Sequence, residues 1–331
     1  MTSPRLRALG PLFVGALASA VSTGCLSGRS VGATPTTARH DPVTTSAAPP
    51  PPTAPPTTKA PSTTTPPSTA TATTLPPGPP YRLGQIVLPL VDTSRPTISH
   101  GQEVSPSRSL PTTVWYPDRP GRWPLLVFAH GFQVGPEPYT SLLETWASHG
   151  YIVAAPSFPL TDAARAGSEL DENDINNQPA DVRFVTDQLV APSSPVAARI
   201  DPGRVAVAGH SDGAETALAA STDGVPAGEP PYRAVIVMSG QPVDGAAGRN
   251  PPALVVQGDA DDTNPPPLGY STWDQAASPK YLLVLQGAGH LPPFEAGSAW
   301  LPGVERVTEE FLDAFVARTA PVGSVAASAS G

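Results

Sequence analysis

One segment of this chain joins a strand-like run, a tight turn and a helix-favouring run without a break: Arg204-Val-Ala-Val-Ala-Gly-His-Ser-Asp-Gly-Ala-Glu-Thr-Ala-Leu-Ala-Ala220. Ser211 lies at the turn, with a glycine two positions before it and another two positions after it. A turn too tight for side chains at the glycine positions lifts the serine hydroxyl clear of the sheet and places N–H groups of the helix start beside it. We therefore interpret Ser211 as a candidate nucleophile. The alternative is an ordinary tight turn.

The order of residues along the chain points to a partner for this serine. On this type of turn the nucleophile is followed first by an acid and then by a histidine. His290 is the only histidine of six that lies downstream of Ser211. It occupies a glycine-rich segment, residues 286–293, directly after the apolar run 281–285. A loop at a strand end suits a general base, so we predict that role for His290. Without Ser211, a turn-capping histidine would be the better interpretation.

The acid should lie on a fixed loop at another strand end, where it can orient the imidazole. Three aspartates follow the strand-like run 253–257, namely Asp259, Asp261 and Asp262. Spacing from the preceding glycine favours Asp261, with Asp262 as the alternative acid, while Asp259 is expected to brace the turn or to lie in solvent. A cation held by the three carboxylates is a further alternative, although adjacent side chains do not easily converge on one ion. We predict no metal and no cofactor.

Acyl transfer also needs N–H donors for the oxyanion that forms on the substrate. One donor should be the backbone N–H of Asp212, the residue after the nucleophile. The other should follow an earlier buried strand, predicted at residues 125–129. Gly131 allows the backbone to approach a substrate there, so we assign the second donor to the N–H of Phe132. Two histidines next to these motifs are interpreted as structural: His130 and His210.

Five motifs together resemble those of the α/β-hydrolases. In chain order they are Thr113–Pro117, His130–Phe132, Gly209–Gly213, Gly258–Asp261 and Gly287–His290. The likeness covers residues 81–318. The chain resembles the branch that holds platelet-activating-factor acetylhydrolases, chlorophyllases, dienelactone-hydrolase-like proteins and bacterial polyester hydrolases of the cutinase type. Two departures matter: Asp212 stands where the polyester hydrolases usually have Met, and Ser211 stands where dienelactone hydrolases usually have Cys.

Strand-like and helix-like segments alternate along the rest of the domain, as in a sheet with helices on both faces. Further strands are predicted at 151–155, 233–238 and 281–285, and helices at 138–149, 180–189 and 304–317. Segments 82–90 and 110–116 read as antiparallel edge strands. We predict an α/β-hydrolase fold over residues 81–318, with a mostly parallel central sheet and antiparallel edge strands on its N-terminal side.

A polar insert between Phe158 and Asn177 leaves the carboxyl edge of the sheet, where ligands bind in this architecture. It contains five acidic residues: Asp162, Glu169, Asp171, Glu172 and Asp174. The simpler interpretation is a solvated loop. The functional hypothesis is an acidic lid that disfavours anionic acyl groups.

The N-terminal residues indicate export. Arg5 and Arg7 precede a mostly apolar stretch, residues 9–21, that is short for a membrane span. Small residues then precede Cys25, which resembles a bacterial lipoprotein box and is the only cysteine in the chain. We predict a lipoprotein signal peptide over residues 1–24, lipidation of Cys25 and anchoring to the outer face of the cell membrane. The alternative is an ordinary signal peptide and a secreted protein.

Composition separates the two ends from the central domain. Residues 33–80 contain 15 Pro and 15 Thr, and almost no large apolar side chains that could offset the entropy of ordering. We predict a disordered tether over residues 25–80, with a reach of about 150 Å if it is extended like polyproline. Residues 319–331 are predicted to be a disordered tail.

Charge and motifs together define the predicted function. A net charge of −9 and only two lysines give no basic patch for nucleic acid and no attraction to anionic membrane surfaces. We predict a monomeric serine hydrolase that cleaves small-molecule, lipid or polymer esters with a triad of Ser211, His290 and Asp261. The alternatives are a serine peptidase or amidase, a cell-envelope acyltransferase and, less favoured, a non-catalytic binding lipoprotein.

Overall fold

The computed structural model describes residues 80–222 and 232–325, all within the unit Ala70–Gly331. The predictions for the signal peptide, for Cys25 and for residues 25–79 of the tether therefore lie outside the described residues. In the two described ranges, no helix is both long and apolar enough to cross a membrane.

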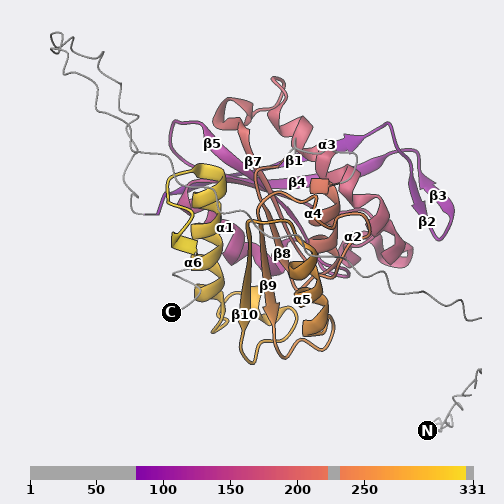
Figure 1. Cartoon of the computed structure of the whole chain (residues 1–331). Helices are drawn as coiled ribbons and strands as arrows, with labels where there is room; N and C mark the ends of the chain where they lie inside the picture. The colour runs from indigo at the N-terminus through magenta and orange to yellow at the C-terminus, as the bar shows by residue number, and fades with distance from the viewer. Residues whose placement is uncertain (1–79, 223–231, 326–331) are drawn as a thin grey trace, which may run out of the picture. The chain divides into compact units, whose positions relative to one another are not determined.

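A single eight-stranded sheet forms the centre of the domain (Figure 1). Its strands, in spatial order, are β1 (Leu83–Asp92), β4 (Arg108–Pro117), β6 (Ile152–Pro156), β5 (Trp123–Ala129), β7 (Ile200–His210), β8 (Val235–Met238), β9 (Ala253–Gly258) and β10 (Lys280–Leu285). The pairs β1–β4 and β4–β6 are antiparallel, and the remaining pairs are parallel. The predicted α/β-hydrolase fold, with its antiparallel edge on the N-terminal side, is confirmed.

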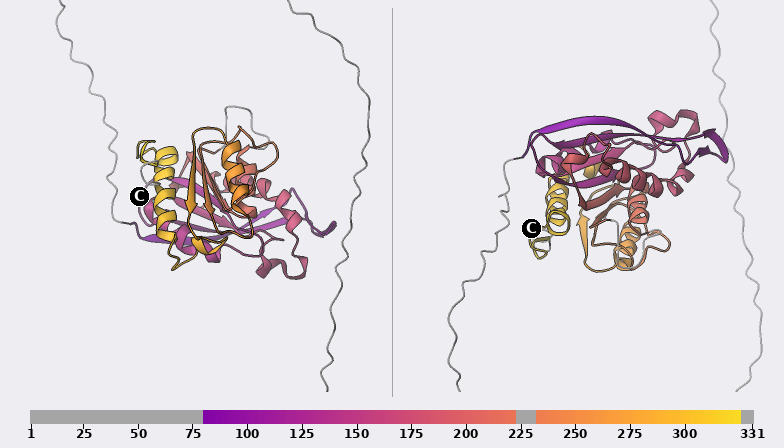
Figure 2. Two further views of the ribbon diagram at one scale, coloured as in Figure 1. Left: turned by 60° about the horizontal axis from the view of Figure 1, so that its bottom comes forward. Right: turned by 90° about the horizontal axis from the view of Figure 1, so that it is seen from above.

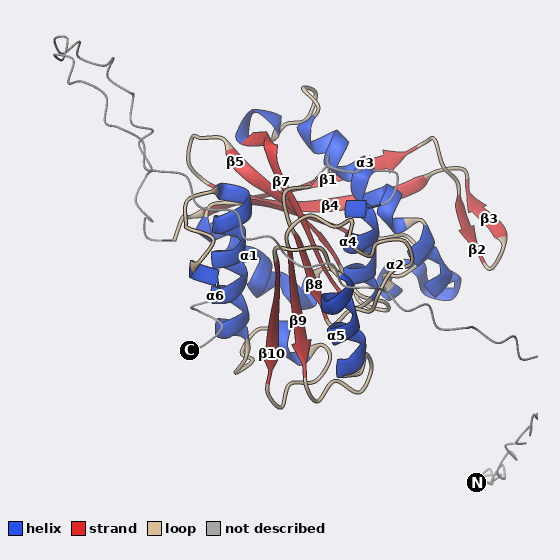
Figure 3. Cartoon of the chain, in the orientation of Figure 1, coloured by secondary structure: helices blue, strands red, loops and turns tan. Residues whose placement is uncertain are grey.

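Helices cover both faces of this sheet (Figures 2 and 3). One face carries α1 (Thr140–His149) and α6 (Leu301–Leu312), and the π-helical turn η6 (Asp313–Ala317) continues α6. The other face carries α3 (Gln178–Val190), α4 (Asp212–Thr222) and α5 (Pro266–Gln275).

The two cores follow from side-chain alternation along the central strands. On β5, Leu126 and Phe128 point to the face where Trp146 of α1 packs, while Leu125 and Val127 point to the opposite face. All five side chains are fully buried. Because parallel strands covered on both faces bury every side chain, their sequences read as continuous apolar runs. This is why the central strands could be located from the sequence.

The insert at 158–177 is not a solvated loop, so the simpler interpretation was wrong. It folds into α2 (Ala163–Ala166), η2 (Gly167–Glu169) and η3 (Glu172–Asn176). Asp162 and Asp171 are buried and accept hydrogen bonds at the starts of α2 and η3. Asp174 is also buried, so only Glu169 and Glu172 remain exposed as the acidic lid hypothesis requires.

A buried ion network attaches this insert to the antiparallel edge of the sheet. Arg108 of β4 is fully buried and forms two hydrogen bonds to Asp174, at 2.8 and 2.9 Å. It also binds Asp181 of α3, at 2.7 and 2.5 Å. Arg95 contacts Asp181 at 2.6 Å and Asp92 of β1 at 2.7 Å. The network therefore joins β1, β4, η3 and α3.

Several elements differ from the prediction. A hairpin of β2 (Thr97–Ser99) and β3 (Gln102–Ser105) extends from the end of β1, at the opposite side of the drawing from α6 (Figure 1). Short helical turns occur at η1 (Glu137–Tyr139), η4 (Ala197–Arg199) and η5 (Pro292–Phe294). The tail assigned to residues 319–331 begins too early, because Val325 is 1% exposed and belongs to the core beside α6.

Candidate active site

Ser211 lies at a sharp turn between β7 and α4. Its φ angle is 56°, in the left-handed region that L-residues rarely adopt. A Cβ atom at Gly209 would lie 1.9 Å from the carbonyl oxygen of Gly213, and a Cβ at Gly213 would lie 2.1 Å from that of Ala129. Only glycine fits at both positions, as the sequence predicted. The strained turn presents Ser211 beyond the carboxyl end of β7.

Three side chains that are far apart in sequence meet at this edge of the sheet. His290 Nε2 lies 2.9 Å from Ser211 Oγ, and His290 Nδ1 lies 2.8 Å from Asp261 Oδ2. The carboxylate of Asp261 is fully buried, whereas the imidazole is 15% exposed. The structure thus brings together the three residues that were selected from the sequence. Asp262, the alternative acid, is exposed to solvent.

The loop that carries Asp261 is fixed by backbone and side-chain hydrogen bonds. Asp261 Oδ1 accepts from the N–H groups of Thr263 and Asn264, at 3.0 and 2.8 Å. Asp259 accepts from the N–H of Gly287 at 2.6 Å and so braces the turn to the loop that carries His290. These bonds hold the acid and the imidazole in register before any substrate binds.

The loop after β5 approaches Ser211 closely. A Cβ atom at Gly131 would lie 3.2 Å from Ser211 Cβ, so the backbone of this loop packs against the turn. His130 Nδ1 donates to the Gly131 carbonyl at 2.9 Å, and its Nε2 accepts from the N–H of Phe158 at 3.0 Å. Burial lowers the pKa of His130 to about 4, so the ring is neutral and braces the loop. Phe132, whose N–H the sequence predicts as an oxyanion donor, is the next residue after Gly131.

Asp212 places a titratable carboxyl beside Ser211. Burial raises the pKa of Asp212 to about 6, and the nearby charge of Glu172 contributes to the rise. Its Oδ2 is buried and has no hydrogen-bond partner among the described residues. Burial also raises the pKa of Glu215 to about 7, opposed by a hydrogen bond with Gln241. Asp212 is the first residue of α4, where backbone N–H groups lack helical acceptors.

Three polar residues of the site were not selected from the sequence. Gln257, inside the apolar run of β9, donates to the carbonyls of Gly258 and Asn264 at 3.0 and 3.1 Å. Asn264 donates to the carbonyl of Ser239 at 2.7 Å. The hydroxyl of Tyr139 donates to His210 Nδ1 at 2.8 Å. A polar residue within an apolar strand was the one available signal, and it applied to Gln257 alone.

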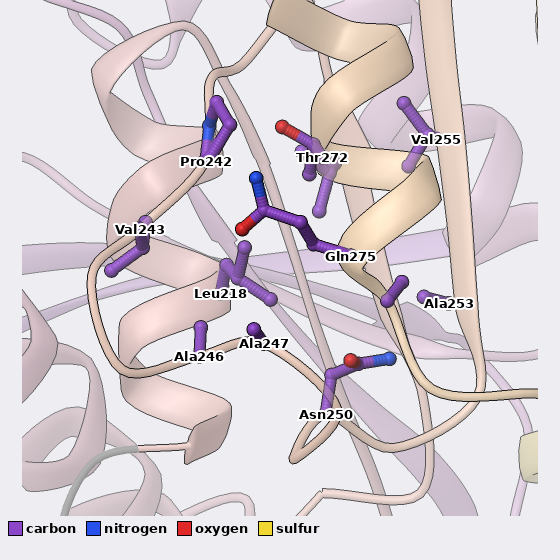
Figure 4. Close-up of a pocket in the computed structure, with 12 residues that line it drawn as sticks. Leu218, Pro242, Val243, Ala246, Ala247, Asn250, Ala253, Val255, Thr272 and Gln275 are labelled. Carbon is purple, nitrogen blue, oxygen red and sulfur yellow. The ribbon is translucent and has the colours of Figure 1, made fainter. Parts of the chain in front are cut away.

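A separate apolar pocket lies between α4 and α5 (Figure 4). Leu218 of α4, Val255 of β9 and Gln275 of α5 contribute to its wall. None of Ser211, Asp261 and His290 lines it, so this pocket is not the site where the three side chains meet. Within the described ranges, no group of three or more His, Cys, Asp or Glu side chains is arranged to hold a metal ion.

This sheet order, with a strained serine turn and with histidine and aspartate at the ends of later strands, defines an α/β-hydrolase. The model of the chlorophyllase family matches residues 85–260, more than half of the chain, and the protein belongs to this family. The matched segment contains Ser211 and ends one residue before Asp261.

Similar curated proteins are plant chlorophyllases. Chlorophyllase-1, chloroplastic, of Citrus unshiu is 29% identical over 133 residues, which cover 40% of this chain and 39% of that protein. Chlorophyllase type 0 of Chenopodium album is 30% identical over 109 residues, which cover 33% of this chain and 31% of that protein. The chain therefore spans less than half the length of the curated relatives that it matches.

Proposed function

We propose that this protein is a serine hydrolase that cleaves carboxylic esters through an acyl-enzyme intermediate. One observation carries the proposal: His290 lies within hydrogen-bond distance of both Ser211 Oγ and the buried carboxylate of Asp261. This geometry allows the imidazole to take the serine proton while the carboxylate stabilises the imidazolium that forms. Family membership supports ester cleavage as the reaction.

The proposed reaction has two halves. Ser211 Oγ attacks the ester carbonyl, and its proton passes to His290 Nε2. The N–H groups of Phe132 and Asp212 are the proposed donors to the resulting oxyanion. Collapse of this intermediate breaks the bond to the alcohol, which leaves with the proton from His290. Water then attacks the acyl-enzyme, with His290 again as base, and releases the acid.

A panel of matched substrates tests the reaction class. We expect the full chain to hydrolyse p-nitrophenyl esters, and Ser211→Ala to reduce kcat by a factor on the order of 10⁴ or more. Ser221→Ala, at a buried serine further along α4, is the control and should retain activity. Chlorophyll belongs in the panel because the relatives' names point to it. Faster cleavage of matched anilides than of esters would favour an amidase, and transfer to added alcohols an acyltransferase.

We also propose that the protein is exported and anchored through a lipid on Cys25. The small residues before this single cysteine motivate the proposal. Mass spectrometry of the mature protein should find a lipid-modified N-terminal cysteine, and Cys25→Ser should shift the protein from the membrane fraction to the soluble fraction. A mature N-terminus beyond residue 25 would refute the anchor.

A further inference from the structure

His210, the residue before the proposed nucleophile, lies between two loops of the site. It ends β7, its side chain is buried, and the reaction proposed above does not use it. Its ring centroid lies 4.6 Å from that of His290 and 5.5 Å from that of Tyr139. Tyr139 is fully buried in η1, directly before α1, and is likewise unused. These two side chains lie between the loop after β5 and the loop that carries His290.

The hydrogen bonds of His210 fix the position of its proton. His210 Nε2 lies 3.1 Å from the backbone carbonyl of His290, and a carbonyl can only accept, so Nε2 carries the proton. Burial lowers the pKa of His210 to about 3, which keeps the ring neutral. Nδ1 must then accept, and its partner is the hydroxyl of Tyr139 at 2.8 Å.

Tyr139 links His210 to the loop after β5, which carries the proposed oxyanion donor Phe132. Because its proton is directed to His210, its oxygen is free to accept, and the N–H of Gly131 lies 3.4 Å away. This N–H therefore points at the tyrosine and is not available to a substrate, which leaves the following N–H, that of Phe132, for the oxyanion. The series runs from Gly131 through Tyr139 and His210 to the backbone of His290.

We propose that Tyr139 and His210 are positioning residues that set the spacing between the oxyanion donor at Phe132 and the general base at His290. This inference rests on the proposed hydrolase function. The pair touches no reacting atom and exchanges no proton during turnover. One end of the rigid, neutral His210 imidazole binds the loop that carries His290, and the other end binds the loop after β5 through the Tyr139 hydroxyl. A tetrahedral intermediate must match the separation of these two loops.

Tyr139→Phe tests the hydrogen bond between the Tyr139 hydroxyl and the loop after β5. Loss of the hydroxyl leaves the N–H of Gly131 without its acceptor, so we expect kcat to fall by about 10- to 100-fold with KM changed less than about two-fold. Affinity for a trifluoromethyl ketone, which forms a tetrahedral adduct, should fall in parallel with kcat. Tyr151→Phe is the matched control, because Tyr151 is also buried and its hydroxyl bonds to Asp313, outside the site.

Substitutions of His210 test the hydrogen bond from its Nε2 to the backbone carbonyl of His290. A glutamine amide extends to the place of Nε2 and can still donate to the His290 carbonyl, whereas an asparagine amide reaches only the place of Nδ1. We expect His210→Gln to retain a phosphonate labelling rate within about 10-fold of wild type and His210→Asn to lose about 100-fold or more. A purely structural role would rank the two variants by thermal stability instead.

Two results would overturn the proposed positioning role of Tyr139 and His210. One is an equal loss of kcat in Tyr139→Phe and Tyr151→Phe. The other comes from nitrogen-15 spectra of histidine-labelled protein, which need no turnover: a His210 ring that is protonated at Nδ1 at neutral pH contradicts the assignment even if esters are hydrolysed. If instead the spectra show the Nε2–H form but wild type neither hydrolyses esters nor reacts with phosphonate, the proposed function fails, and the catalytic role of the pair fails with it.

Discussion

Asp261 and Asp262 are adjacent in sequence, yet the structure gives them different surroundings. Asp261 is buried against His290 and accepts two backbone N–H bonds, whereas Asp262 faces solvent. We expect Asp261→Asn to lower kcat by a factor on the order of 10³ to 10⁴, because the amide cannot stabilise the imidazolium. Asp262→Asn should stay within about two-fold of wild type. Steady-state rates with a p-nitrophenyl ester compare the two. The reverse order would transfer the acid's role to Asp262.

The raised pKa of Asp212 predicts a selectivity that depends on pH. Its carboxyl is protonated below a pKa of about 6 and negatively charged above it. The ratio of kcat/KM for an ester with an anionic acyl group to that for a matched neutral ester should therefore fall as pH rises through about 6. In Asp212→Asn the decrease of this ratio with rising pH should be smaller by about 3-fold or more. Dividing by the rate for the neutral ester removes the effect of titration of the triad itself. An unchanged ratio would show that Asp212 does not repel the substrate.

At this scale the meeting of Ser211, His290 and Asp261 could be predicted, because the proposed reaction needs particular side chains in a particular order. Ser211 and His290 were fixed by the turn motif and by position along the chain. Tyr139 could not be selected, since a tyrosine between prolines and polar residues has no pattern that announces a bond to His210 about 70 residues away. Such contacts depend on how loops from different strands meet, and a local pattern does not contain that.

Among the elements, α1 ends at a histidine whose charge matters for stability. His149 Nε2 lies 3.0 Å from Asp313 and its Nδ1 lies 3.6 Å from Glu309, so it fastens α1 to α6 and η6. The hydrogen bond with Asp313 raises the pKa of His149 above 6.5. A raised folded-state pKa stabilises the protein below the unfolded value, and the stabilisation disappears as pH rises through the folded value.

Relative to wild type, His149→Gln should therefore lower the melting temperature more at about pH 6 than at about pH 9. His100→Gln is the control, because its side chain is 62% exposed. Calorimetric scans at a series of pH values give the difference. A deficit that grows with rising pH would contradict the assignment of the charge.

Strands were the best predicted elements, and the helices and turns near the site were less well predicted. Buried parallel strands such as β5 and β9 can be recognised in the sequence as continuous apolar runs. The helix α5 was missed because it opens with prolines, although proline is well tolerated in the first helical turn. The insert was misread because aspartates look solvated in sequence. Whether Asp174 is buried depends on Arg108, which lies on β4, 66 residues earlier in the sequence.

For the whole molecule, the buried network around Arg108 joins the edge of the sheet to the insert and to α3. Arg108→Met would leave the carboxylate of Asp174 buried without its guanidinium partner and would leave Asp181 with Arg95 alone. We expect a loss of about 3–5 kcal/mol in the free energy of unfolding and a melting temperature lower by roughly 10 °C.

Arg204→Met is the matched control, because its ion pair with Asp201 is about one-third exposed and should contribute less than about 1 kcal/mol. Equal effects of the two substitutions in a denaturant titration would show that the buried network does not hold the domain together.

Covalent labelling of the full chain by a fluorophosphonate, followed by peptide mass spectrometry, tests most directly whether Ser211 is a nucleophile activated by His290. We expect one phosphonylated residue, Ser211, with labelling abolished in Ser211→Ala and strongly slowed in His290→Ala, where no imidazole remains to take the serine proton. Failure of the wild-type protein to react, or a label on another serine with Ser211 unmodified, would contradict this assignment.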